Sequence, residues 1–271
     1  MDESRFSVSP QSLYHRLGSE LAPVLIDVRE GPDFAADERM IVGAIRRSPE
    51  AVADWRAELP ADRPLVVYCV KGGEVGRTAA AALRESGVEA RHLEGGITAW
   101  REAGLPLHRK LGEPGAAWVT RERPKIDRIA CPWLIRRFID PAARFFFAPT
   151  ERVFAVAAEK GATAFDIPGA EPFSHVGPQC SFDAFLNVYG IADPALDVLA
   201  DIVRGADTAR LELTPQSPGL LAMSLGLAAI CADDHAMLER GMTLYDALYA
   251  WCRDCRGEGH DWNPASMMAR A

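Results

Sequence analysis

Residues 66–83, VVYCVKGGEVGRTAAAAL, restrict the fold more than any other stretch of the chain. The segment begins as a continuous apolar run, typical of a strand buried on both faces, and ends as an alanine-rich helix former. A second apolar run, LIDV at 25–28, precedes it, and a further short strand is predicted at 91–93, followed by the helix ITAWREAG. Short buried strands that alternate with helices predict an α/β fold, with a parallel sheet flanked by helices on both faces.

The chain changes character after residue 103. Residues 104–117 hold two prolines and three glycines without hydrophobic periodicity, which predicts a connection between domains. Beyond it, two predicted strands, ARFFFAP and ATAFDIPG, flank the helix RVFAVAAEK. Three further helices are predicted, one capped by Ser181 and the others opened by Asp193-Pro194 and Ser217-Pro218. We therefore predict a first domain over 1–108, a linker over 109–117, a helix-rich α+β domain over 118–256 and a polar tail over 257–271.

Composition limits the classes of function. Both parts of the chain are net acidic within a total charge of −8, which disfavours a nucleic-acid-binding protein. Residues 121–128 hold several arginines but also acidic residues, and we interpret them as a solvated face. No apolar leader or membrane-length run is present, so no membrane insertion is expected and the cytoplasm is the expected location. Six cysteines in a chain of this length indicate thiols, a nucleophile or metal ligands.

Cys69 stands where open α/β sheets bind their ligands, at the carboxyl end of a predicted central strand. The glycine-bearing loop after it offers backbone amides, and the following helix offers its positive end. Lys71 and Arg77 add charge if they point inward. These effects favour a thiolate and predict a nucleophilic cysteine. The alternative is a buried structural cysteine that ends a strand.

The first 108 residues resemble a rhodanese domain. The resemblance is carried by LIDVRE (25–30), GAI (43–45), VVYCVKGG and HLEGGITAWREAGLPL (92–107). It implies a sulfurtransferase that forms a persulfide on Cys69 without a cofactor and takes sulfur from a small donor to a thiol acceptor. It also implies that the transferred group is held by Val70, Lys71, Gly72, Gly73, Glu74, Val75, Gly76 and Arg77.

Two features depart from the family pattern. Arg77 stands eight residues after the cysteine, where the family brings its arginine at about the fifth, so a longer loop that accepts a larger oxyanion is expected. The histidine common before the GAI segment is absent.

The second part of the chain gathers histidines and carboxylates in two stretches, FDIPGAEPFSHVGPQCSFD and CADDHAMLERGM. One interpretation is a divalent metal with mixed nitrogen and oxygen ligands. The other is structural hydrogen bonding and helix capping. The candidate ligands are His175, His235, Glu171, Asp183 and Asp207. A zinc site is indicated only weakly by Cys252, Cys255 and His260, because no second cysteine pair is near them.

The same stretches, together with IDRIACPWLIRRFID, IVRGAD and DDHAMLERGMTLYDALYAW, resemble the C-terminal domain of the ChrB chromate-resistance family over about 118–253. This resemblance implies a setting, chromate resistance, often beside an exporter, but no reaction. Two hypotheses follow: a sulfurtransferase linked to chromate resistance, or a thiol-based oxyanion or redox sensor or regulatory binding protein without turnover. The spacing also allows a site shared by Cys69 and the His175 loop.

Overall fold

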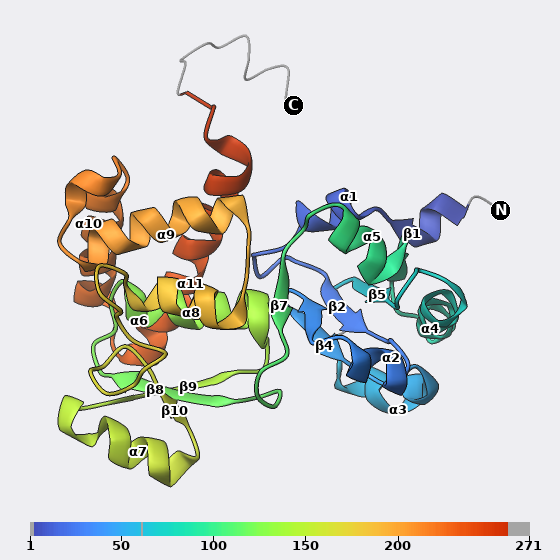
Figure 1. Ribbon diagram of the computed structural model, residues 1–271, viewed down its shortest axis with the longest axis horizontal. Coiled ribbons are helices and arrows are strands. Elements are labelled where there is room, and N and C mark those ends of the chain that lie inside the picture. The colour runs from blue at the N-terminus through green and yellow to red at the C-terminus, as the bar shows by residue number, and fades with distance from the viewer. Residues whose placement is uncertain (1–2, 61, 260–271) are drawn as a thin grey trace.

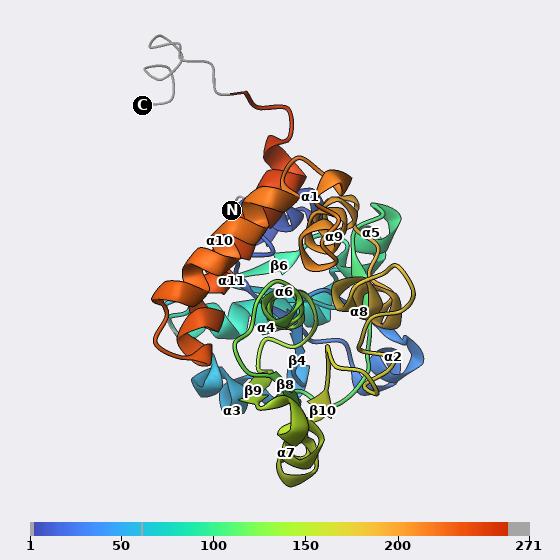
Figure 2. The same ribbon diagram turned by 90° about the vertical axis from the view of Figure 1, so that its left-hand side faces the viewer.

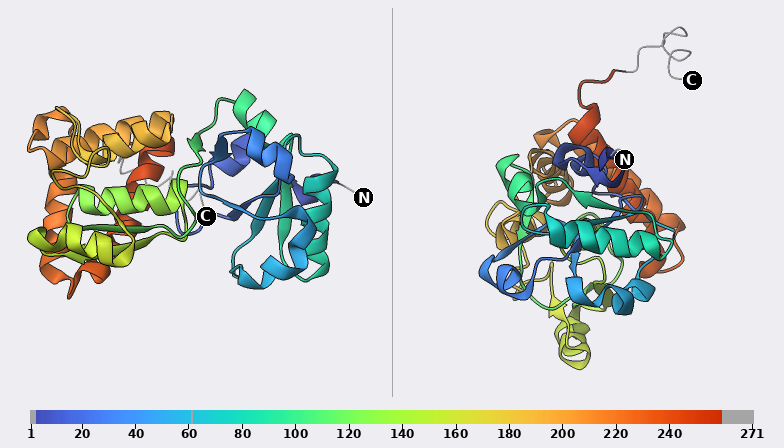
Figure 3. Two further views of the ribbon diagram at one scale, coloured as in Figure 1. Left: turned by 60° about the horizontal axis from the view of Figure 1, so that its bottom comes forward. Right: turned by 90° about the vertical axis from the view of Figure 1, so that its right-hand side faces the viewer.

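The computed structural model describes residues 3–60 and 62–259 (Figure 1). The amino-terminal part forms one lobe, and the chain beyond about residue 116 forms a second lobe beside it (Figures 1 and 3). The predicted tail lies largely in 260–271, outside the described residues, as does His260.

The first lobe is built on a five-stranded sheet in which every neighbouring pair is parallel. In spatial order its strands are β1 (Ser7–Val8), β6 (Ala90–Leu93), β5 (Leu65–Tyr68), β2 (Val24–Asp27) and β4 (Ala44–Arg46). Two adjacent inner strands, β5 and β2, are buried at all four positions, as their unbroken apolar sequence predicts. The predicted α/β class and these two strands are confirmed.

Helices cover both faces of this sheet. They are α1 (Pro10–Tyr14), α2 (Gly31–Ala36), α3 (Val52–Trp55), α4 (Glu74–Glu85) and α5 (Gly96–Glu102). Successive β5 residues belong to two separate apolar clusters. Val66 is in a cluster with Trp100 of α5, and Val67 is in another with Leu83 of α4. Helix α3 is short, and one 3₁₀ turn flanks it on each side (Pro49–Ala51 and Arg56–Glu58).

Within the residues that the structure describes, the second lobe combines a small parallel sheet with six α-helices. The sheet has the order β10 (Thr163–Ala164), β8 (Ala117–Arg121) and β9 (Arg144–Ala148). The α-helices are α6 (Asp127–Leu134), α7 (Val153–Lys160), α8 (Ser181–Tyr189), α9 (Pro194–Asp207), α10 (Ser217–Ile230) and α11 (Asp234–Ala250). Helix α7 lies on one face of the sheet and α6 and α8 on the other, while α10 and α11 line one side of the lobe (Figures 1 and 2). The helix-rich α+β prediction is confirmed.

One strand of this lobe was not predicted, and one helix cap was assigned to the wrong residue. The unpredicted strand is β8. Its Trp118 packs against Phe185 of α8, with 5.3 Å between the ring centroids. Ser181 is not the cap of α8. Cys180 holds that position, and the Ser181 hydroxyl donates to Asp166 instead, at 2.8 Å.

The second lobe packs on the amino-terminal edge of the five-stranded sheet. The Gly43 amide, just before β4, donates to the Phe138 carbonyl at 2.8 Å, and the Glu20 amide donates to the Asp246 carboxylate at 3.0 Å. At the side, the Tyr14 hydroxyl donates to Asp193 at 2.8 Å. One apolar cluster contains residues of both lobes. The lobes therefore share a core.

A two-stranded antiparallel ribbon flanks this junction. It pairs β3 (Arg39–Ile41) with β7 (Leu107–Arg109). Strand β7 thus occupies the start of the proline-rich connection, and 110–116 continue it without helix or strand.

His108 in β7 makes the stability of the protein sensitive to acid. Its ring is buried, and this burial lowers the pKa of His108 from 6.5 to about 4, outweighing the hydrogen bond to the Arg109 carbonyl. The pKa of His108 is lower in the folded protein than in the unfolded chain. The stability that depends on a neutral His108 is therefore fully present above pH 6.5 and is lost as the pH falls toward 4. We expect His108→Gln to reduce the loss of unfolding free energy between pH 7 and 4.5 by about 2 kcal/mol. Urea denaturation at the two pH values checks this, and equal losses in both proteins would contradict it.

Candidate functional site

Cys69 follows β5 directly and lies at the carboxyl edge of the sheet, with a side chain that is almost fully buried. Helix α4 begins only five residues later, at Glu74, with Gly73 as its N-cap. The predicted long loop is therefore wrong: Glu74, Val75, Gly76 and Arg77 form the first turn of the helix. Glu74 suits this place because a helix amino terminus favours an acidic side chain.

The start of α4 is directed at the thiol. A Cβ placed on Gly76 would lie 3.3 Å from Cys69 Sγ, so the backbone of the first turn closely approaches the sulfur. The first amides of a helix have no intrahelical acceptor, and Gly73 has no side chain to cap them. A helix amino terminus in this position favours an anionic group bound beside the sulfur.

The glycine pair at the start of α5 holds the Cys69 loop from the other side. Gly95 and Gly96 both have left-handed backbone conformations, with φ of 65° and 59°. The Ile97 and Thr98 amides donate to the Cys69 and Val70 carbonyls, each at 3.0 Å. The EGG turn of the sequence thus allows α5 to touch the loop.

Gly96→Ala is expected to disrupt this contact. A Cβ at Gly96 would lie 2.3 Å from the Cys69 carbonyl oxygen, so the loop must move as well as accept a strained φ. We expect a loss of about 2–4 kcal/mol in unfolding free energy. Gly104→Ala is the matched control, because Gly104 has φ of 67° but no atom within 4 Å of an added Cβ, and it should cost about 1–2 kcal/mol. Urea unfolding compares them, and similar losses would contradict the predicted clash.

A buried ion pair, Asp27–Arg29, lies next to the residue that precedes Cys69. Asp27, at the end of β2, is fully buried and accepts hydrogen bonds from Arg29 Nε at 3.0 Å, from Arg29 Nη2 at 2.6 Å and from the Tyr68 hydroxyl at 2.9 Å. Arg29 also binds Asp37 at 2.9 Å. Burial, followed by the Asp27 charge, raises the pKa of Tyr68 well above its usual value. Asp27 and Arg29 had no predicted role, although an Asp-x-Arg pattern at the end of an apolar strand is a signal for such a pair.

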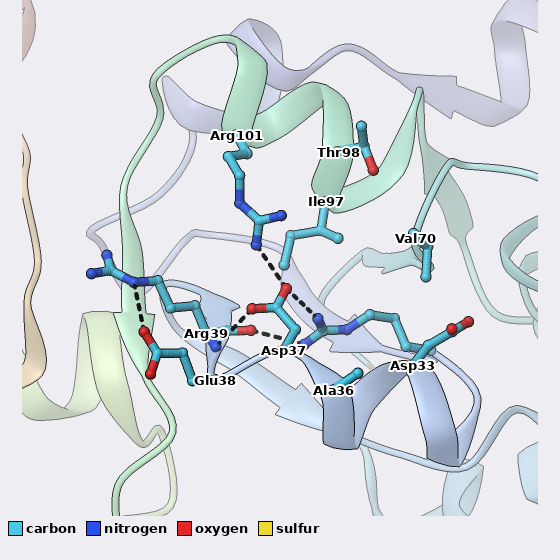
Figure 4. A pocket seen from close by; sticks show the side chains of 10 residues that line it. Asp33, Ala36, Asp37, Glu38, Arg39, Val70, Ile97, Thr98 and Arg101 are labelled. Carbon is cyan, nitrogen blue, oxygen red and sulfur yellow. Dashed lines mark hydrogen bonds and ion pairs between the residues drawn. The ribbon is translucent and has the colours of Figure 1, made fainter.

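A cavity of about 500 Å³ opens beside the loop (Figure 4). It is lined by Val70, the residue after the cysteine, and by Thr98 and three arginines, Arg29, Arg39 and Arg101. Cys69 itself does not line it. This cavity is the candidate place for a substrate that reaches the loop.

The charged residues predicted around the cysteine are all exposed. Lys71 lies in the loop, and Glu74 lies in the first turn of α4. Arg77 lines a second cavity, of about 320 Å³, together with Phe6 and His92.

The candidate metal ligands are brought together only in part. His175 Nε2 lies 3.2 Å from Asp207 Oδ2 and 3.5 Å from Asp127 Oδ2. Asp183 instead pairs with Arg204 at 2.6 Å and accepts from the Cys180 amide. The other two candidates lie apart from this group: His235 packs edge-on against the Phe147 ring, and Glu171 is exposed.

Asp127 is the member of this cluster that the sequence analysis missed. It was placed on a solvated face, yet it is fully buried as the first residue of α6. Burial, then the neighbouring Asp207 and Asp166 carboxylates, raise the pKa of Asp127 well above its usual range. Burial and Asp166 also raise the pKa of Asp207, and the hydrogen bond to Asp166 raises that of His175.

The two sites lie at opposite sides of the molecule. Ser181 at the start of α8 and Asp207 at the end of α9 belong to the cluster, whereas Gly190 after α8 and Asp193 before α9 contact the first lobe. Cys69 is at the sheet edge that faces away from the second lobe. A site shared by Cys69 and His175 is therefore not formed.

Comparison with known proteins identifies both parts of the chain. Residues 9–103 match the rhodanese-like domain family, and residues 118–252 match the ChrB C-terminal domain family. Protein ChrB of Cupriavidus metallidurans is 34% identical over 136 residues, which are 50% of this chain and 40% of ChrB. This chain therefore matches less than half of that relative's length.

Two further relatives match the first lobe. The thiosulfate sulfurtransferase GlpE of Shewanella oneidensis is 36% identical over 80 residues, covering 29% of this chain and 76% of GlpE. The crystal structure of a rhodanese-related protein from Thermoplasma volcanium is 26% identical, with a TM-score of 0.33, and the match covers 37% of this chain and 95% of that one. Among the described residues, no helix combines the length and apolar content needed to cross a bilayer.

Proposed function

We propose that this chain, which belongs to the rhodanese-like family and continues into a ChrB C-terminal domain, is a sulfurtransferase that carries sulfur as a persulfide on Cys69. One observation carries the proposal: Cys69 ends the central strand with its sulfur against the first turn of α4, where Gly76 leaves room beside it. A thiol in this position meets helix amides that stabilise its anion.

The reaction proceeds in two displacements. The Cys69 thiolate attacks the outer sulfur of thiosulfate, a new S–S bond forms, and the old S–S bond breaks as sulfite leaves with the electron pair. A nucleophilic acceptor, a thiol or cyanide, then attacks the outer sulfur of the persulfide and regenerates the thiolate. The amides at the start of α4 stabilise the negative charge on the persulfide between the two steps. The exchange needs no cofactor.

The setting proposed for this activity is chromate resistance in the cytoplasm, on the strength of the ChrB match. We propose the domain division 1–108, 109–117, 118–256 and 257–271, which agrees with the matched ranges 9–103 and 118–252. The cavity beside Val70 and Thr98 is the proposed binding place of the acceptor.

Turnover of thiosulfate and cyanide to thiocyanate tests the proposed activity. The full-length protein should form thiocyanate in many-fold molar excess over enzyme. A protein that binds or oxidises without turnover, as a thiol sensor would, should form at most one equivalent. That result would overturn the sulfurtransferase proposal.

A further inference from the structure

We propose that the ChrB-type domain binds one divalent first-row metal ion between Asp127, His175 and Asp207, independently of sulfur transfer. The three residues come from distant parts of the chain. Asp127 begins α6, Asp207 ends α9, and His175 lies in the loop before α8.

The side chains are already close enough to share an ion. One potential ligand atom from each residue lies within 4.8 Å of the other two. The His175 Nε2 atom is 3.2 Å from Asp207 Oδ2 and 3.5 Å from Asp127 Oδ2. Ligands bound about 2.1 Å from a common ion lie roughly 3–3.5 Å from one another. Only small movements would therefore bring these atoms to a metal.

Asp127 supplies an independent observation that points to a missing ligand. It is fully buried, and its Oδ1 atom has no hydrogen-bond partner among the described residues. The other oxygen, Oδ2, accepts from the Ser181 amide at 2.5 Å and faces His175. An unpaired buried carboxylate oxygen is costly, and a cation bound by both oxygens of Asp127 would satisfy it.

Two carboxylates of the cluster, those of Asp127 and Asp207, can be neutralised by one divalent cation. The third acidic residue, Asp166, also faces His175, with its Oδ1 atom 3.4 Å from His175 Nε2. It is already paired with Arg121 at 3.0 Å and with Arg128 at 3.4 Å, and it accepts from the Ser181 hydroxyl. Asp127 and Asp207 remain, with His175 as a neutral ligand once its proton is displaced. A divalent ion neutralises these two carboxylates.

The donor set selects the class of metal. An imidazole with carboxylates suits ions such as Mn²⁺, Fe²⁺ and Zn²⁺, whereas Mg²⁺ and Ca²⁺ prefer oxygen alone. The His175 side chain is 41% exposed, so water can reach the ion and complete its coordination. The site is therefore open, as in metal centres that exchange a ligand.

Mn²⁺ binding to the full-length, metal-stripped protein tests the proposal. Mn²⁺ is the probe because the free cysteines would also take up Zn²⁺. Electron paramagnetic resonance of the free ion should show one Mn²⁺ bound per chain, and His175→Ala should weaken binding at least tenfold. Asp127→Asn should do the same, provided that circular dichroism shows an unchanged fold.

His235→Ala is the matched control, because His235 is exposed and packs on Phe147 outside the cluster. It should leave Mn²⁺ affinity unchanged. No bound Mn²⁺, or equal losses in the His175 and His235 variants, would overturn the site. Thiosulfate turnover should be the same with and without Mn²⁺, so the two proposals fail separately.

Discussion

Cys69→Ser is expected to abolish the transfer of sulfur from thiosulfate to cyanide, with a fall in rate of at least about 10³-fold. Serine keeps the size of the side chain, but its hydroxyl is not ionised near neutral pH and forms no persulfide. The helix amides around Gly76 would remain in place, so the loss would report the sulfur itself. Thiocyanate formation under saturating thiosulfate measures the effect.

Cys255→Ser provides the control for general effects of removing a thiol. Cys255 is a free, partly exposed cysteine in the π-helical turn Trp251–Cys255. It should retain the wild-type rate. Turnover in Cys69→Ser close to that of Cys255→Ser would show that another group carries the sulfur.

Asp27→Ala is expected to lower the free energy of unfolding by about 3–5 kcal/mol, the largest stability effect predicted here. The substitution leaves the Arg29 guanidinium, of which only 1% is exposed, without its main counter-charge. It also removes the acceptor of the Tyr68 hydroxyl, one residue before Cys69. Urea denaturation at neutral pH measures the loss.

The matched comparison is Glu159→Ala. Glu159 pairs with Arg152 at 3.1 Å, but both side chains are more than half exposed. Removing such a pair costs about 0–1 kcal/mol, because water replaces the partner. Equal losses in the two variants would contradict a stabilising role for the buried pair.

The sequence predicted features that are encoded locally. An unbroken apolar run identified β5, and the glycine loop beside it indicated Cys69 as the candidate nucleophile of the first lobe. The start of α4 was placed too late, because a glutamate in the first helical turn was counted as loop. The ribbon of β3 and β7 was not predicted, since its strands are three residues long and their paired residues are 66 to 70 positions apart in sequence.

The second site depends on contacts that local patterns do not encode. His175 and Asp207 were predicted as ligands, but Asp127 was placed on the surface because arginines surround it in sequence. Its burial results from the packing of the starts of α6 and α8, where the Ser181 amide binds its carboxylate. Asp183 was predicted as a metal ligand only because it is near His175 in sequence. In the fold it pairs with Arg204 instead.

The separation of the two sites affects how the protein is to be studied. Cys69 lies at the carboxyl edge of the five-stranded sheet, while the second lobe covers the opposite edge through Gly43 and Glu20. Substitutions at one site should therefore leave the chemistry of the other unchanged. Communication between them would have to cross the interface between the lobes, which includes the shared core and the Tyr14–Asp193 contact.

The most direct test of the proposed function is the intact mass of the protein after brief treatment with thiosulfate and removal of the reagent. We predict that the wild-type chain gains the mass of one sulfur atom, that cyanide removes it, and that Cys69→Ser gains nothing. An unchanged wild-type mass, or an equal gain in the Cys69 variant, would contradict a persulfide on Cys69.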